Sequence, residues 1–160
     1  MLFRSMASRI RTLAASLATS IGAWGSLPAN ITVSRRRSVS VILDDLNDNA
    51  GEIAVICPRT EDTSNRADVS EDITIGIVLL VRCTGEAATA SDTYEDFLEA
   101  LCDHLRTSST FKSITLSGNI AARRRTIGII TPCDADALDQ HEVFVGVIEG
   151  VWAVSVGNRA

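Results

Sequence analysis

Apolar residues near the N-terminus recur every three or four positions, which places them on one face of an α-helix. Gly22 and Gly25, followed by Pro28, predict where this helix ends. The segment lacks acidic residues and contains Arg and Ser, as mitochondrial transit peptides do, but we interpret residues 1–25 as the first helix of the fold. A helix lying on a membrane surface is the alternative. The apolar stripe comprises Met6, Ile10, Leu13, Leu17, Ile21 and Trp24.

Strand-like segments fill most of the remaining chain. Some alternate apolar and polar residues, and the segment 73–83 is continuously apolar and rich in β-branched residues, which favours a central buried strand. Pro58 predicts the end of a short strand, and the polar stretch 59–70 is expected to be a loop. The segment 117–131 is expected to form a hairpin or an extended arm with a basic middle. The expected strands cover residues 31–41, 53–57, 73–83, 111–116, 120–130 and 143–156.

A second helix is predicted over residues 92–107. Ser91 is a suitable N-cap, acidic residues follow it, and Phe97, Leu98, Leu101 and Leu105 recur at helical spacing. A turn or short helix is expected at 134–139. The predicted order is helix, three strands, helix, three strands, in a single domain spanning 1–160. The fold class is therefore α+β, with a mixed, mostly antiparallel β-sheet packed by two main helices.

Charge divides the chain unevenly. The net charge is −5, yet the first 43 residues carry +6 and no acidic residue, while the remainder carries −11. This split predicts head-to-tail packing between copies, or a basic edge that faces another charged surface. It argues against a free nucleic-acid-binding protein, which is usually basic over its whole domain.

Two runs of three arginines are the most unusual local features, at 35–37 and 123–125. Neighbouring residues of a strand point to opposite faces, so each run places charge on both sides of the sheet. The arginines are interpreted as a solvated face, as partners of acidic groups on a neighbouring subunit, or as contacts to phosphates in a DNA channel. The candidate subunit-interface or channel-facing residues are Arg35, Arg36, Arg37, Arg123, Arg124 and Arg125. We expect Arg36→Glu to weaken assembly more than folding.

Motifs for catalysis and cofactor binding are missing from the sequence. It contains neither a phosphate-binding glycine loop nor a G-x-S-x-G nucleophile elbow. We expect His104 to be a solvated helix residue and His141 to lie at the start of a strand; a triad that combines a serine with Asp139 and His141 stays open. No enzymatic activity, metal or cofactor is predicted. The cysteines are interpreted as buried free thiols, and a zinc site would need the poorly spaced set Cys102, His104, Cys133 and His141.

The succession of segments resembles one type of tail terminator, or tail-completion protein, of long-tailed bacteriophages. The similarity extends from the first helix to the last strand and rests on helix and strand patterns with a few landmarks. These landmarks are Ile42-Leu-Asp-Asp-Leu46, Ile53-Ala-Val-Ile-Cys-Pro-Arg59, the polar loop before Asp72-Ile-Thr-Ile-Gly-Ile77, Phe97-Leu-Glu-Ala-Leu-Cys-Asp-His-Leu-Arg106, and the acidic turn at 134–140 leading into Val143-Phe-Val-Gly-Val-Ile-Glu-Gly-Val-Trp152.

The resemblance implies a structural virion protein of the phage neck. Such a subunit forms a ring, commonly a hexamer, that caps the head-proximal end of the tail tube and stops its polymerisation. Its partners would be its own copies, the tail tube protein and the head–tail connector or adaptor, with non-specific contact to DNA in the channel. It would have no membrane partner, and it would lie in the virion, or in the host cytoplasm during assembly.

Three alternatives remain beside the tail terminator. One is another head-to-tail joining protein, such as a head-completion or adaptor subunit. The others are an independent nucleic-acid-binding module and a hydrolase without a recognised motif. The loop at 59–70 and the arm at 117–131 are the segments expected to reach tube or connector partners.

Overall fold

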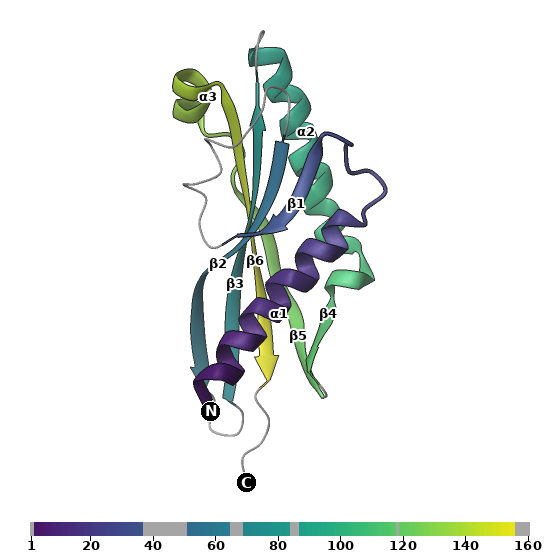
Figure 1. Cartoon of the computed structure of the whole chain (residues 1–160), viewed down its shortest axis with the longest axis vertical. Helices are drawn as coiled ribbons and strands as arrows, with labels where there is room; N and C mark the ends of the chain where they lie inside the picture. The colour runs from purple at the N-terminus through teal and green to yellow at the C-terminus, as the bar shows by residue number, and fades with distance from the viewer. Residues whose placement is uncertain (1, 37–50, 65–68, 84–86, 118, 156–160) are drawn as a thin grey trace.

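A single mixed sheet with helices on one side forms the fold (Figure 1). The structure is a computed structural model and describes residues 2–36, 51–64, 69–83, 87–117 and 119–155. The helices are α1 (Leu2–Gly22), α2 (Ala87–Thr107) and α3 (Ala135–His141), with a 3₁₀ turn η1 (Ser109–Phe111). The strands are β1 (Ile31–Arg35), β2 (Gly51–Ser64), β3 (Val69–Arg82), β4 (Ser113–Ser117), β5 (Ile120–Thr131) and β6 (Val143–Ser155).

The six strands lie in the order β1-β2-β3-β6-β5-β4. β1 pairs with β2 in parallel, and the other neighbours are antiparallel. The predicted α+β class, with a mostly antiparallel sheet and two main helices, is confirmed. β3 and β6 are the central strands, as the apolar run at 73–83 predicts, because a strand with neighbours on both sides and a helix layer above it loses contact with water.

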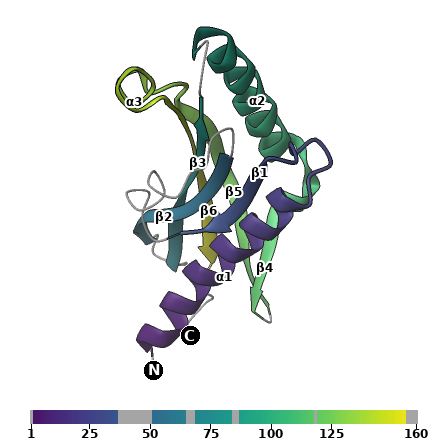
Figure 2. The same cartoon turned by 45° about the horizontal axis from the view of Figure 1, so that its top comes forward.

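α1 and α2 cover the same face of the sheet and pack over its two halves (Figures 1 and 2). Leu13, Leu17 and Ile21 of α1 are fully buried, which confirms this part of the predicted stripe. On α2, the buried residues are Leu98 and Leu105 among others, again at helical spacing. Both helices contribute to one hydrophobic core with the inward side chains of the sheet. Removal of this apolar surface from water is the main stabilising term of the fold.

Two glycines of β6 let bulky side chains lie flat against the sheet. A Cβ atom at Gly150 would come within 2.5 Å of the Trp152 ring, and one at Gly146 within 2.7 Å of Leu98 on α2. The fully buried Trp152 also donates a hydrogen bond from Nε1 to the Phe111 carbonyl oxygen, at 3.0 Å. The polar atom of the indole is therefore satisfied inside the core, as a buried tryptophan requires.

β2 does not end at Pro58, and the loop predicted at 59–70 is wrong. The strand continues to Ser64, and β3 already begins at Val69, so the two form a long antiparallel pair. The register shifts between Ile56 and Arg59. A β-bulge leaves a residue outside the ladder, so a proline there loses no strand hydrogen bond, and the strand continues past it.

The other predicted boundaries differ less. α2 begins at Ala87, so Ser91 lies inside the helix and is not its N-cap. The segment predicted as a hairpin or an arm at 117–131 is a hairpin strand, and because β5 lies between β6 and β4 it is part of the sheet. Beyond β1, the strand expected to reach residue 41 lies mostly outside the described residues. No helix within the described segments is long and apolar enough to cross a membrane.

Candidate interaction surfaces

The first arginine run lies at the end of β1, an edge strand of the sheet. Val33 packs against the core below α1, and because strand residues alternate, Arg35 lies on the same helix-covered side. Arg36 follows on the opposite side, and both side chains are exposed. Arg37 lies outside the described residues. An edge position is what allows consecutive residues of this kind to reach solvent on both sides of the sheet.

Arg36 is tied to a buried carboxylate. Its Nε lies 2.9 Å from Oε1 of Glu52, and the Ser34 hydroxyl donates to the same oxygen. Glu52 is only 6% exposed, so its charge needs these donors to offset the loss of hydration. Arg36→Glu would bring a second carboxylate to this place. We therefore expect that substitution to damage folding, contrary to the expectation from the sequence.

A pocket of about 180 Å³ lies beside Arg35, between α1, the end of β1 and the middle of β2. Arg11, on the exposed side of α1, and Arg35 supply guanidinium groups at its rim. This volume has room for a carboxylate side chain. Arg36 is a third arginine in its wall, and Ile10, Ala14 and Cys57 form the apolar part. The pocket is therefore suited to an anionic group with a short apolar stem.

Two arginines of the basic N-terminal third are held by carboxylates from β2 and β3. Arg36 is held by Glu52, as above, and Arg9 of α1 lies 3.8 Å from Glu71 of β3, with both side chains at least nine-tenths buried. Burial raises the pKa of the neighbouring Cys57 thiol, and Glu71 raises it further. The thiol at the pocket wall is therefore held in its neutral form. Arg11 and Arg35, which also line the pocket, are exposed.

The second arginine run has a different role, because it lies on the inner strand β5. Arg124 points under the C-terminal end of α2 and donates to the carbonyl oxygens of Leu105, at 2.6 Å, and Ser108, at 3.2 Å. The Leu105 carbonyl lies in the last turn of α2, where the helix supplies no N–H for it, so the guanidinium group caps the helix. The Ser108 carbonyl, just beyond the helix, also accepts from the Phe111 N–H at 3.3 Å. Arg125 forms an ion pair with Asp72 on the other side of the sheet, at 3.2 Å. Arg123 is exposed.

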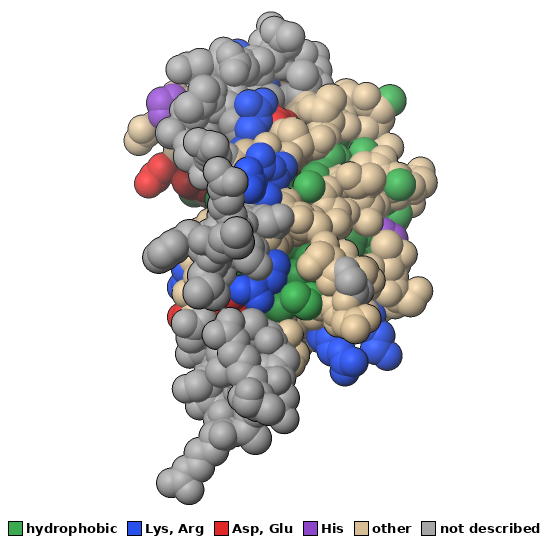
Figure 3. Space-filling view, turned by 60° about the horizontal axis from the view of Figure 1, so that its bottom comes forward, with side chains coloured by type: hydrophobic (Ala, Val, Ile, Leu, Met, Phe, Trp, Pro, Cys, Tyr) green, Lys and Arg blue, Asp and Glu red, His purple; other side chains and the backbone are tan. Residues whose placement is uncertain are grey.

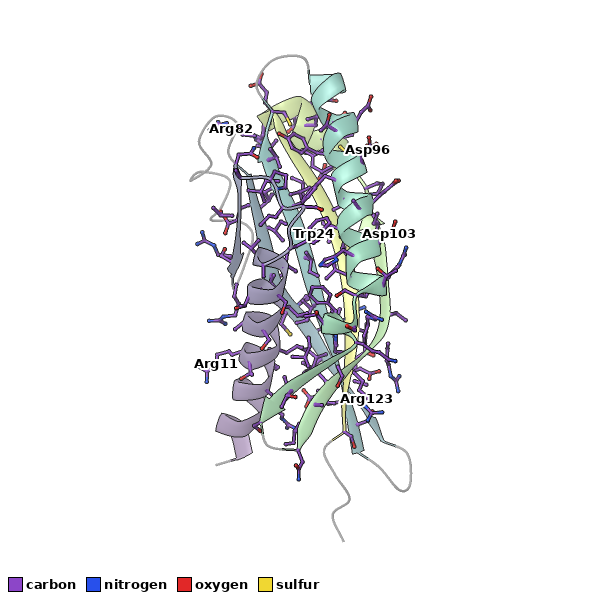
Figure 4. All side chains as sticks on the ribbon, turned by 90° about the vertical axis from the view of Figure 1, so that its right-hand side faces the viewer. Arg11, Trp24, Arg82, Asp96, Asp103 and Arg123 are labelled. Carbon is purple, nitrogen blue, oxygen red and sulfur yellow. The ribbon has the colours of Figure 1, made fainter. Side chains whose placement is uncertain are left out.

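An acidic stripe runs along the exposed face of α2. Its spacing of three and four residues places the carboxylates one above another, over about 16 Å of helix at 1.5 Å per residue. One of them, Asp103, lies 3.7 Å from Arg106 of the same helix. Figure 4 shows Asp96 and Asp103 projecting from one side of the molecule and Arg11 from the other. The acidic stripe consists of Asp92, Asp96, Glu99 and Asp103, all exposed.

The acidic stripe and Arg11 were not singled out by the sequence reasoning. The signal for the stripe is the spacing 92, 96, 99, 103 within a predicted helix, whose acidic residues were taken as support for the helix start. Glu52 gave no signal, because its burial depends on strands that pair only in the folded chain. Figure 3, which brings the lower end of the molecule forward, shows more basic than acidic surface among the described side chains.

His104 is not a solvated helix residue. Its ring stacks on Trp24 with centroids 4.7 Å apart and meets the edge of Phe111 at 5.3 Å. Burial lowers the pKa of His104 below its ordinary value, which favours the neutral imidazole. His141 lies in the last turn of α3, directly before β6.

The four cysteines are free thiols, of which Cys83 and Cys102 are buried. Burial raises the pKa of both thiols. Across the described parts of the chain, no three or more His, Cys, Asp and Glu side chains gather where they could hold a metal ion.

No protein-family model matches the chain, and no curated protein matches its sequence. A function for these surfaces is therefore inferred from their geometry and charge and from the family resemblance.

Proposed function

We propose that the chain is a ring-forming structural protein of a bacteriophage neck, a tail terminator that caps the head-proximal end of the tail tube and joins it to the capsid connector. The observation that carries the proposal is the placement of opposite charges on opposite sides of one small domain. The acidic stripe of α2 faces away from the basic pocket formed by α1 and β1. In this proposal the protein has a mechanical role and uses no cofactor.

Opposite charges on opposite sides favour a heterologous contact, in which one surface of a copy meets a different surface of the next. Repetition of such a contact produces a closed ring when the rotation between copies closes, and an open filament when it does not. The sheet edges support side-chain contacts over strand pairing between copies, because β1 and β4 are only five residues long. This agrees with the ring that the family resemblance implies.

The arginine runs also bear on the DNA-binding alternative. Arg124 and Arg125 are occupied by α2 and Asp72, and Arg36 by Glu52, so the two runs do not join into one basic face. A nucleic-acid surface normally presents a continuous basic patch. The described surface is therefore better suited to contacts between protein subunits.

The test is electron microscopy of the purified protein, alone and mixed with the cognate tail-tube protein. We expect closed rings that bind one end of the tube and stop its elongation. Rings that bind the capsid connector and leave the tube unaffected would identify another neck protein instead. A monomer that binds DNA with a steep salt dependence, and neither forms rings nor affects the tube, would overturn the proposal in favour of a nucleic-acid module.

A further inference from the structure

We propose that the acidic stripe of α2 on one copy docks into the Arg11–Arg35 pocket of a second copy, with a carboxylate of the stripe seated between the two guanidinium groups. This pairing names the partner surfaces of the ring and in that sense rests on the proposed function. The sequence-based expectation placed the interface in the two arginine runs. Of the arginines in those runs, Arg35 belongs to the interface proposed here, together with Arg11 and α2.

The pocket has the chemistry that a carboxylate requires. Two guanidinium groups form charge-assisted, often bidentate, hydrogen bonds with a carboxylate, and such bonds are about twice as strong as neutral ones. The apolar lining supplied by Ile10 and Ala14 excludes part of the water around the pair, which strengthens it relative to a pair on an open surface. Cys57, a neutral thiol, adds no charge of its own.

The stripe has the form that the pocket requires. Asp92, Asp96 and Glu99 stand exposed on a helix whose opposite face, through Leu98 and Leu101, is fixed to the core. The carboxylates are therefore presented on a rigid element, which reduces the entropy lost on binding. Asp103 lies 3.7 Å from Arg106 of its own helix.

The two surfaces cannot meet within one chain. Arg11 and the carboxylates of Asp96 and Asp103 project from opposite sides of the molecule (Figure 4). The pairing is therefore intermolecular, and each copy contributes both a donor and a receptor surface. A second copy is the partner that the charge complementarity favours.

Two charge-reversal variants test the pairing: Arg35→Glu in the pocket and Asp96→Arg in the stripe. Both positions are exposed, and we expect far-UV circular dichroism and thermal midpoints close to those of the unaltered protein. Each variant alone should self-associate about tenfold more weakly or worse, because like charges then face one another. Mass photometry and sedimentation velocity measure the distribution of oligomers.

Mixing the two variants gives the decisive result. Arg35→Glu keeps an intact stripe, and Asp96→Arg keeps an intact pocket, so one natural contact forms between them. We expect a one-to-one dimer that does not grow further, because its two outer surfaces carry the substitutions. A mixture that stays monomeric would overturn the pairing, as would variants that assemble as the unaltered protein does.

Matched controls separate the pairing from general charge effects. Arg123→Glu and Asp139→Arg make the same charge changes at other exposed positions and should leave self-association unchanged. If either position proves sensitive to folding, Arg11→Gln and Glu99→Gln remove charge with less disturbance and should weaken association in the same direction. An unaltered protein that stays monomeric alone and with the tail tube would also overturn the pairing.

The outcomes distinguish the pairing from the proposed function. Closed rings of the unaltered protein that persist in both charge-reversal variants would overturn the pairing and leave the function standing. A mixed-variant dimer, together with open chains that do not affect the tail tube, would support the pairing and overturn the function.

Discussion

The two arginine runs have the same sequence but lie at different places in the sheet. Arg35 and Arg36 lie at the end of an edge strand, where Arg35 borders an open pocket. The run at 123–125 lies on β5, with neighbours on both sides, and its central residue caps α2 from below. The place of a strand in the sheet therefore determines which contacts its arginines can make. Each run has a residue with an internal partner, because Glu52 holds Arg36 and the end of α2 holds Arg124. The runs differ in that Arg35 at the edge borders an open pocket, whereas Arg125 on the inner strand pairs with Asp72.

Of the substitutions in the two runs, Arg124→Ala should lower stability the most. The Leu105 carbonyl in the last turn of α2 loses its charged donor, and the Ser108 carbonyl keeps only the Phe111 N–H. We expect the free energy of unfolding to fall by about 2 kcal/mol, since a hydrogen bond to a charged group contributes ~1.5–3 kcal/mol. Urea denaturation followed by circular dichroism measures the change. Arg123→Ala, one residue away and exposed, should change stability by less than about 0.5 kcal/mol, and equal losses in the two variants would contradict the capping role.

Arg125→Ala should have a smaller effect. Its partner Asp72 is 14% exposed, while the arginine itself is 53% exposed, so solvent screens the pair. We expect a loss of about 1 kcal/mol or less in the free energy of unfolding. Arg59→Ala is the matched control, because it removes a similar pair with Glu149 at 3.3 Å and higher exposure of both groups. A larger loss in Arg59→Ala would show that burial of the carboxylate does not set the difference.

The arginines stay charged throughout the accessible pH range, so they add nothing to the pH dependence of stability, and His104 can be tested separately. His104 has a pKa below its ordinary value of 6.5 in the folded chain, so the unfolded chain binds its proton more readily. Its contribution to stability is therefore complete above pH 6.5 and is lost as the pH falls through the unfolded value towards the folded one. His104→Phe should remove this part of the pH dependence, which lies at and below the ordinary histidine pKa of 6.5. An unchanged slope in denaturation curves would contradict the role of His104.

Arg35→Ala should have the smallest effect on stability, within about 0.5 kcal/mol, because its exposed side chain borders a pocket. The same substitution should weaken self-association, measured by sedimentation velocity over a range of concentrations. The two substitutions would then have different effects. Arg35→Ala would weaken assembly without lowering stability, whereas Arg124→Ala would lower stability. A stability loss in Arg35→Ala as large as that in Arg124→Ala would contradict this separation.

Local patterns predicted most of the fold. The helical spacing of Leu13, Leu17 and Ile21, and the unbroken apolar run of β3, depend on residues close in sequence, so their periodicity is visible in the chain itself. The predictions that went wrong depended on pairing partners. Pro58 by itself predicts the end of a strand. Once β3 pairs with β2, the bulge at this position leaves no hydrogen bond for the missing N–H to make, and the strand continues.

By itself, the sequence determined the fold class, the two helix faces that pack on the sheet, and the uneven division of charge. Only the tertiary structure decided which charges remain for partners. Glu52 and Asp72 become buried through strand pairing and then hold Arg36 and Arg125, while Arg35 stays at an open edge. The physical reason is desolvation, because a charge removed from water must find a partner, and distant parts of the chain supply that partner only when folded.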